Sequence, residues 1–248
     1  PGIDIGWKFL QTVTTMAVAV PSLMTVFNLA ASLEIGGRAR GGRGLLAWIG
    51  RLPWGEPGFS GLALAMVLFA GGGIGGIINA SFNLNAVIHN TSWVPGHLHL
   101  TVGSAVALTF MATSYWLLPV LTGKRLWGRG LALAQTYLWF GGMVIFSGAM
   151  HWAGVLGSPR RTADVTYGNN PVAASWLPQI NTAAVGGTLM FTSIVLFSLV
   201  VVVTLLSRQR EAVSPPWAEA LSGPEAAPWL LDRWGLWIGV AVALVLVA

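Results

Sequence analysis

Between Glu56 and Lys124 the chain runs for 67 residues, 57–123, without one Asp, Glu, Lys or Arg. A membrane-crossing helix needs about 20 apolar residues, so this run is long enough for two crossings. The polar residues of 81–90 predict a turn between them. Other charge-free runs cover 9–33, 130–159, 165–207 and 234–248. The pattern predicts an integral membrane protein.

The composition favours a membrane protein built from helices. Hydrophobic residues make up 54% of the chain and charged residues 8%, and long apolar runs are typical of transmembrane helices. The residues do not alternate in the ten-residue segments of a transmembrane β-barrel. We predict an all-α, polytopic transmembrane helix bundle in a single domain over 1–248. About six helices are expected, near 8–33, 58–80, 94–120, 130–156, 175–206 and 229–248.

The positive charges predict which helix ends face the cytoplasm. Alternating helices place the loops 34–58, 121–130 and 207–228 on one side of the bilayer. All lysines and arginines lie there or just inside the next span, except Lys8, Arg160 and Arg161. Cytoplasmic loops are enriched in positive charge, so this side is the cytoplasmic one. The net charge of +5 therefore needs no nucleic-acid partner.

A histidine motif lies inside the longest charge-free run. It reads His89-Asn-Thr-Ser-Trp-Val-Pro-Gly-His97-Leu-His99. Ionisable side chains at membrane depth are costly and usually functional. Residues two apart on a helix differ by about 200° in azimuth, so His97 and His99 should project from nearly opposite faces. They are placed to hold two separate cofactors, and imidazole is a good ligand of haem iron.

The other two histidines are less informative. The position of His89 in a polar turn fits a metal ligand, a contact to a haem propionate or a solvated loop residue. His151 fits a polar side chain that bonds to a neighbouring helix.

Arg160 and Arg161 break the charge pattern, because they lie on the same outer side as the histidines. A solvated loop pair is the commoner role for adjacent arginines. Two guanidinium groups at the edge of a low-dielectric bundle nevertheless favour an anion site. Haem propionates fit such a site through charge-assisted hydrogen bonds.

Ser22, Thr25 and Asn28 form a polar stripe on the first helix. Such a stripe suits a proton path of hydroxyl groups and waters, although these side chains often bond only to their own backbone. The glycine-rich run 71–76 lies at mid-membrane without a strand or Lys, so it favours close helix packing over phosphate binding. The chain contains no cysteine, which excludes disulfides and thiolate metal sites. It begins with Pro and stops inside an apolar segment, so we expect a piece of a longer protein.

Eight motifs carry a resemblance to a known family. They are Pro1-Gly-Ile-Asp4, Val20-Pro-Ser-Leu-Met-Thr25, Ala30-Ala-Ser-Leu-Glu34, the histidine motif, Tyr115-Trp-Leu-Leu-Pro119, Leu121-Thr-Gly-Lys124, His151-Trp-Ala-Gly154 and Pro159-Arg-Arg161. Together they resemble subunit I of the haem–copper oxygen reductases, specifically the B-type (ba-type) cytochrome c oxidases. By this resemblance the chain is the C-terminal portion of that subunit.

The resemblance implies roles for individual residues. His97 is similar to the ligand of a high-spin a-type haem iron, and His99 to one of the two ligands of a low-spin b-type haem iron. Arg160 and Arg161 resemble the pair that holds the propionates, and His89 resembles a residue near a propionate. Ser22 and Thr25 match polar positions of the family's proton-uptake path.

The chain departs from the family pattern at three asparagines. Asn28 stands at a position where the resemblance implies Thr, and Asn85 at one where it implies an acid. Asn90 follows His89 where A-type oxidases carry the Asp of a magnesium site, so no magnesium is predicted. The copper ligands, the redox-active Tyr and the second low-spin haem ligand are expected upstream of Pro1.

These expectations describe an oxidoreductase of the respiratory chain in the bacterial cytoplasmic (inner) membrane. The complete enzyme would reduce O2 to water and pump protons, with cytochrome c as electron donor and oxidase subunit II as partner. The chain alone would be inactive. Two alternatives stay open at this stage. One is a haem–copper enzyme like nitric oxide reductase, and the other is a non-haem transporter that uses the histidines as a proton relay.

Overall fold

The computed structural model describes residues 4–211, 229 and 233–247. Every regular element in these ranges is helical, which confirms the predicted all-α class. Pro1–Ser214 form one compact unit, and Pro215–Ala248 form a second unit that contains the apolar helix α8 (Trp234–Val247). The single domain over 1–248 stays a prediction.

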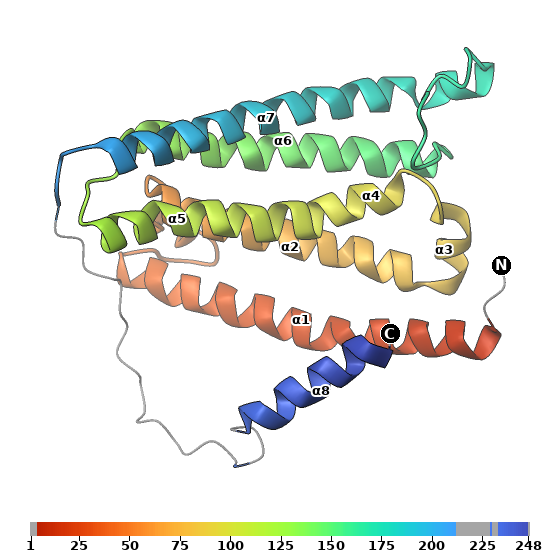
Figure 1. Ribbon diagram of the computed structural model, residues 1–248, viewed down its shortest axis with the longest axis horizontal. Coiled ribbons are helices and arrows are strands. Elements are labelled where there is room, and N and C mark those ends of the chain that lie inside the picture. The colour runs from red at the N-terminus through yellow and green to blue at the C-terminus, as the bar shows by residue number, and fades with distance from the viewer. Residues whose placement is uncertain (1–3, 212–228, 230–232, 248) are drawn as a thin grey trace. The chain divides into compact units, whose positions relative to one another are not determined.

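Five helical segments of the first unit are long and apolar enough to cross a membrane. They are α1 (Ile5–Ala39), α2 (Pro57–Ala80), the rod Trp93–Thr122, α6 (Arg129–Val155) and α7 (Leu177–Leu206). They lie side by side in a bundle, with α6 against α7 and the rod against α2 (Figure 1). The multi-pass membrane fold is therefore confirmed.

The rod is not a uniform helix. It begins as α4 (Trp93–Leu98), continues as a π-helix over His99–Val106 and ends as α5 (Ala107–Thr122). The sequence predicted one helix over 94–120 and gave no sign of the wider turns. Short π-helical stretches inside α-helices are frequent at functional sites, and this one begins at a histidine of the motif.

Two boundaries differ from the sequence prediction. The expected turn over 81–90 contains a short helix, α3 (Phe82–Ile88), which starts after the extended backbone of Ser81. The last helix begins at Trp234 and not near 229, where Trp229 lies in a turn. Residues 230–232 of the expected helix lie outside the described residues. Short helices inside polar turns are easily missed because their apolar pattern is brief.

Glycines let the helices of the bundle approach closely. A Cβ atom on Gly72 of α2 would lie 2.3 Å from Cγ2 of Thr101 in the rod. A Cβ atom on Gly186 of α7 would lie 2.6 Å from the carbonyl oxygen of Gly142 in α6. Small residues at membrane helix contacts act in this way, which agrees with the packing role predicted for 71–76.

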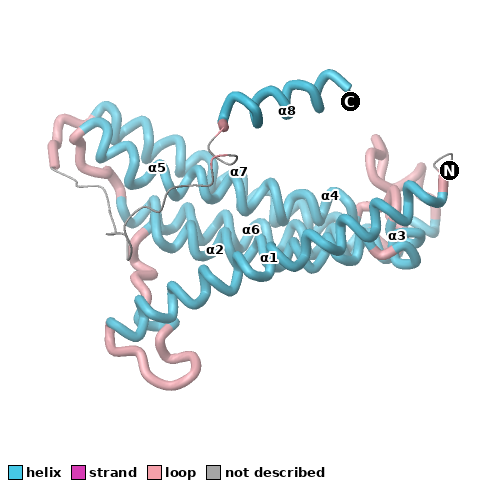
Figure 2. The backbone as a smooth tube through the Cα atoms, turned by 90° about the horizontal axis from the view of Figure 1, so that it is seen from below, coloured by secondary structure: helices cyan, strands magenta, loops and turns pink. Residues whose placement is uncertain are grey.

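Seen from below, the loop 157–176 and α3 lie at one end of the bundle, and the connection from α1 to α2 lies at the other (Figure 2). The end with α3 and the start of the rod is called the histidine end here. The predicted site is located at that end.

Candidate functional site

A cavity of about 330 Å³ lies at the histidine end of the bundle. It brings together four residues that the sequence singled out, which are Asn85, His89, His97 and Arg160. They come from α3, from the turn after it, from α4 and from the loop after α6. Residues far apart in the sequence therefore share one cavity.

Hydrogen bonds between two distant segments fix this arrangement. The backbone N–H of Ser92 donates to the carbonyl of Ser158 over 2.8 Å. The backbone N–H of Arg160 donates to the carbonyl of Asn90 over 2.9 Å, and its guanidinium donates to Oδ1 of Asn90 over 2.8 Å. The loop after α6 is thus tied to the start of the rod, with Arg160 beside His89.

His97 projects from α4 toward α2. A Cβ atom on Gly75 would lie 3.1 Å from its Nδ1, and a Cβ atom on Gly76 would lie 3.3 Å from its Cε1. The Gly72 backbone also interacts with the ring, although the buried Nδ1 makes no hydrogen bond of ordinary geometry to any described residue. The glycine-rich run therefore forms the wall against which the imidazole packs.

His99 has different neighbours. Its ring centroid lies 5.0 Å from that of Phe146 on α6, and the side chain is exposed. Its Nδ1 lies 2.6 Å from the carbonyl oxygen of Pro95. A carbonyl can only accept, so Nδ1 carries the proton and the lone pair resides on Nε2. The two rings of the motif thus pack against α2 and α6, as residues on opposite faces of the rod should.

The two adjacent arginines occupy different positions relative to the cavity. Arg160 lines the cavity, whereas Arg161 is exposed and does not. Arg161 adopts a φ of 62°, which turns the chain away after the Asn90 contact. Only Arg160 joins the two histidines in this structure.

Three polar residues of the cavity were missed by the sequence analysis. They are Gln11 and Thr15 on α1, and Asn79 at the end of α2. Oδ1 of Asn79 is buried without a hydrogen-bond partner in the described part of the chain. The four-residue spacing of Gln11 and Thr15 places both on one face of α1, and this periodicity was the available signal. A second cavity of about 660 Å³, lined by Lys8, continues along these residues.

His151 was expected to bond to a neighbouring helix, but it bonds within its own helix. Its Nδ1 lies 2.7 Å from the carbonyl of Ser147 on the previous turn of α6. Its ring packs edge-on against Trp93 at 4.5 Å between centroids. His151 is therefore a polar packing residue between α6 and the rod.

The polar stripe of α1 lies outside this cavity. The hydroxyl groups of Ser22 and Thr25 donate to the carbonyls of Val18 and Pro21, over 2.9 and 3.0 Å. Asn28 is exposed on the same helix. Backbone bonding of this kind is common for Ser and Thr in membrane helices.

Within residues 4–211 and the described part of α8, no cluster of three or more His, Asp or Glu side chains could hold a metal ion. The described histidines instead offer one imidazole ring each, and a single ring can bind the metal of a planar group that carries its own remaining ligands. An open Nε2 on His99 and a glycine wall beside His97 fit two planar metal-bearing groups, one on each side of the rod.

The sequence profile described as cytochrome c and quinol oxidase polypeptide I matches residues 1–190. The chain belongs to this family. It is 48% identical over its whole length to cytochrome c oxidase subunit 1 of Thermus thermophilus, and covers 45% of that protein. A cytochrome c oxidase polypeptide 1 of Halobacterium salinarum is 28% identical over 73% of the chain and 26% of the relative.

A solved structure supports the same assignment. A subunit of a haem–copper terminal oxidase dimer, determined by cryo-EM, superposes with a TM-score of 0.84 at 37% identity. The superposition covers 96% of this chain and 43% of that subunit. The chain spans about half the length of these relatives, as expected for a piece of subunit I.

Proposed function

We propose that the chain is the C-terminal portion of the catalytic subunit of a B-type cytochrome c oxidase, and that it supplies one axial histidine to each of two haems. The complete enzyme reduces O2 to water at a copper-bearing centre, and the copper ligands lie in the part that precedes this chain. Cytochrome c delivers electrons through oxidase subunit II. The complex lies in the bacterial inner membrane.

The observation that carries the proposal is the hydrogen bond from Nδ1 of His99 to the Pro95 carbonyl, at 2.6 Å. Histidines that bind metals usually donate their second ring N–H to a carbonyl or carboxylate, which fixes the ring and its tautomer. The free Nε2 of His99 is then available to bind the iron of the low-spin b-type haem. Its exposed position leaves room for a flat group.

On the other face, His97 serves the high-spin a-type haem. Gly75 and Gly76 bring α2 close to the His97 imidazole, and a side chain on either residue would crowd the ring. The helix wall therefore limits how His97 can rotate. When bound, the haem would supply redox-active iron on this face, and the rod would keep the two histidine ligands a fixed distance apart.

Arg160 and His89 bind the propionates at the histidine end. Arg160 lies at the cavity wall with its guanidinium steered by Asn90. A guanidinium presents several donors in one plane, which suits a carboxylate. The family resemblance also supports Arg161 for this site, and in this structure its side chain lies outside the cavity.

Ser22, Thr25 and Asn28 form part of the proton-uptake path along α1. Their side chains lie on one helix that runs from the predicted cytoplasmic end toward Gln11 and Thr15. Hydroxyl groups that bond to their own backbone keep free acceptor lone pairs and can hold waters. Proton uptake along this path supports proton pumping by the complete enzyme.

The test uses the full-length oxidase and its optical spectra. We expect His99→Leu to remove the low-spin haem absorption and to spare the carbon-monoxide-reactive haem. His97→Leu should do the reverse. His151→Gln, a change to the polar packing residue, should leave both haems in place and serves as the control.

Depletion of one and the same haem by both leucine variants would contradict the two-face assignment. A pyridine haemochrome spectrum without haem would remove the oxidase function altogether. Parallel turnover assays with O2 and nitric oxide separate the oxidase from a nitric oxide reductase built on the same scaffold.

A further inference from the structure

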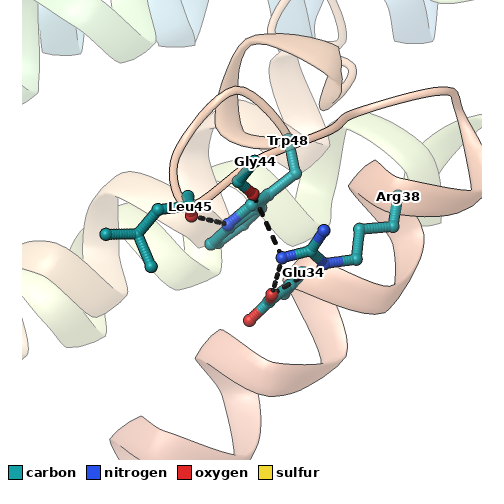
Figure 3. Close-up of polar contacts among 5 residues, drawn as sticks. All are labelled: Glu34, Arg38, Gly44, Leu45 and Trp48. Carbon is teal, nitrogen blue, oxygen red and sulfur yellow. Dashed lines mark hydrogen bonds and ion pairs between the residues drawn. The ribbon is translucent and has the colours of Figure 1, made fainter.

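The connection between α1 and α2 exposes apolar side chains outside the membrane spans. Leu45 and Leu46 have exposed fractions of 82% and 65%. They precede the 3-10 helix η1 (Ile49–Arg51) and lie at the end of the bundle opposite the histidine end (Figure 2). The side chain of Leu45 points away from α1 (Figure 3). Two adjacent exposed leucines form a small apolar patch, which becomes informative together with the charges of the same loop.

This loop has a defined conformation. Arg38 forms an ion pair with Glu34 one turn earlier and also donates to the carbonyl of Gly44 over 3.1 Å (Figure 3). The indole N–H of Trp48 donates to the carbonyl of Leu45 over 2.8 Å. A Cβ atom on Gly37 would lie only 2.5 Å from the Trp48 carbonyl oxygen. The loop is therefore packed onto the last turns of α1.

Three arginines lie within five residues of the exposed leucines in the sequence. Arg40, Arg43 and Arg51 are all exposed. None of them forms an ion pair among the residues that the structure describes, whereas Arg38, Arg125 and Arg129 do. The guanidinium of Arg40 donates to the Gly36 carbonyl of its own helix. The loop thus combines the exposed Leu45 and Leu46 with arginine side chains that form no ion pair with a described carboxylate.

We propose that the loop 40–51 is an interfacial anchor that inserts Leu45 and Leu46 into the bilayer boundary and binds anionic phospholipid headgroups. Interfacial segments combine buried apolar side chains with flanking Lys and Arg in this way. Phosphate oxygens accept charge-assisted hydrogen bonds from guanidinium groups. The proposal requires only the membrane fold, so it does not depend on the proposed oxidase function.

The test measures which lipid lies beside residue 45. A fluorophore is attached at Leu45→Cys in the full-length oxidase, which is placed in bilayers with brominated phosphatidylglycerol or brominated phosphatidylcholine. Each arginine near an anionic surface strengthens lipid attraction roughly fivefold. We expect the quenching ratio of phosphatidylglycerol to phosphatidylcholine to be about five or more. In Arg43→Gln/Arg51→Gln, which keeps Arg40, the ratio should fall at least fivefold.

Two controls separate charge from folding. Arg43→Lys/Arg51→Lys keeps the positive charges and should retain the preference for phosphatidylglycerol. Arg208→Gln removes an exposed arginine after α7, in a different loop of the same predicted side, and should not change quenching at residue 45.

Two results would overturn the proposal. Equal quenching by both lipids in the parent protein would exclude anionic headgroup binding. Absence of quenching by either lipid would mean that protein or water covers the leucines, for instance another part of the complete subunit.

Discussion

At the scale of single residues, contacts to backbone carbonyl oxygens fix which ring nitrogen of two histidines carries the proton. The Pro95 and Ser147 carbonyls hold Nδ1 of His99 and His151, so both rings offer Nε2. The difference lies in the surroundings. Nε2 of His151 faces Gly75 inside the bundle, whereas the ring of His99 is exposed. The same local bond therefore produces a packing residue in one place and a candidate ligand in the other.

A carboxylate outside the membrane gives a pH prediction. The hydroxyl group of Thr166 and the backbone N–H groups of Gly168 and Thr166 donate to Asp164 and hold its pKa below the ordinary 3.8. These bonds stabilise the loop above the unfolded pKa, and the stabilisation is lost as pH falls through the lowered folded pKa. Thr166→Val should move the pKa back toward 3.8. A carbon-13 NMR titration of the Asp164 carboxyl group measures the shift, and an unchanged midpoint would contradict it.

Gln135 carries a second residue-scale prediction, on stability. It is fully buried, accepts a hydrogen bond from Tyr115 over 2.6 Å and donates to Oγ of Ser193 over 2.9 Å. Gln135→Leu leaves the buried Tyr115 hydroxyl without its acceptor, whereas Ser193 still donates to the backbone carbonyl of residue 135. The change should cost about 1–3 kcal/mol of unfolding free energy. Tyr115→Phe removes one bond and should cost less. Thermal unfolding of the detergent-solubilised oxidase provides the comparison, and equal midpoints for Gln135→Leu and the parent would refute the network's role.

At the scale of elements, the contact between α6 and α7 depends on glycine. A Cβ atom on Gly186 would lie 2.5 Å from the backbone nitrogen of Phe146, whereas one on Gly187 would lie 3.8 Å from the Phe146 ring. Gly186→Ala should therefore separate the helices and cost about 1–3 kcal/mol. Gly187→Ala is the matched control and should leave the unfolding temperature nearly unchanged. A larger loss in the control would show that helix separation is not the cause.

Some helix bounds could be predicted from the sequence, and others could not. The ranges 58–80 and 130–156 lie within one residue of the observed α2 and α6. Glu56 and Arg129 mark where these helices begin, and the polar segment 81–90 and the Gly-Ser-Pro segment 157–159 follow their ends. The π-helix of His99–Val106 and the short α3 were not predicted, since neither changes the apolar pattern. In the site, the azimuth argument predicts different neighbours for the two histidines, and the rings of His97 and His99 lie against Gly75 of α2 and Phe146 of α6. Their roles as ligands stay predictions. The spacing of Gln11 and Thr15 gave their shared face, but Asn79 joins the cavity through helix packing that sequence spacing does not encode.

At the scale of the whole molecule, charge distribution predicts orientation. The chain has no cysteine, so single cysteines can be introduced without background labelling from this part. Gln209→Cys, just after α7, should react with a membrane-impermeant maleimide only from the cytoplasmic side. Val172→Cys, in the loop before α7, should react only from the outside. Labelling of both positions from one side would contradict the predicted topology.

The ties between Asn90–Ser92 and Ser158–Arg160 have a consequence for how the protein is made. The ribosome releases the start of the rod long before the loop after α6, so the cavity that His97 and Arg160 share is incomplete while α6 is still being inserted. If that cavity takes the prosthetic group proposed above, the group should enter only after Arg160 has been translated, into a nascent chain whose α6 has already crossed the bilayer.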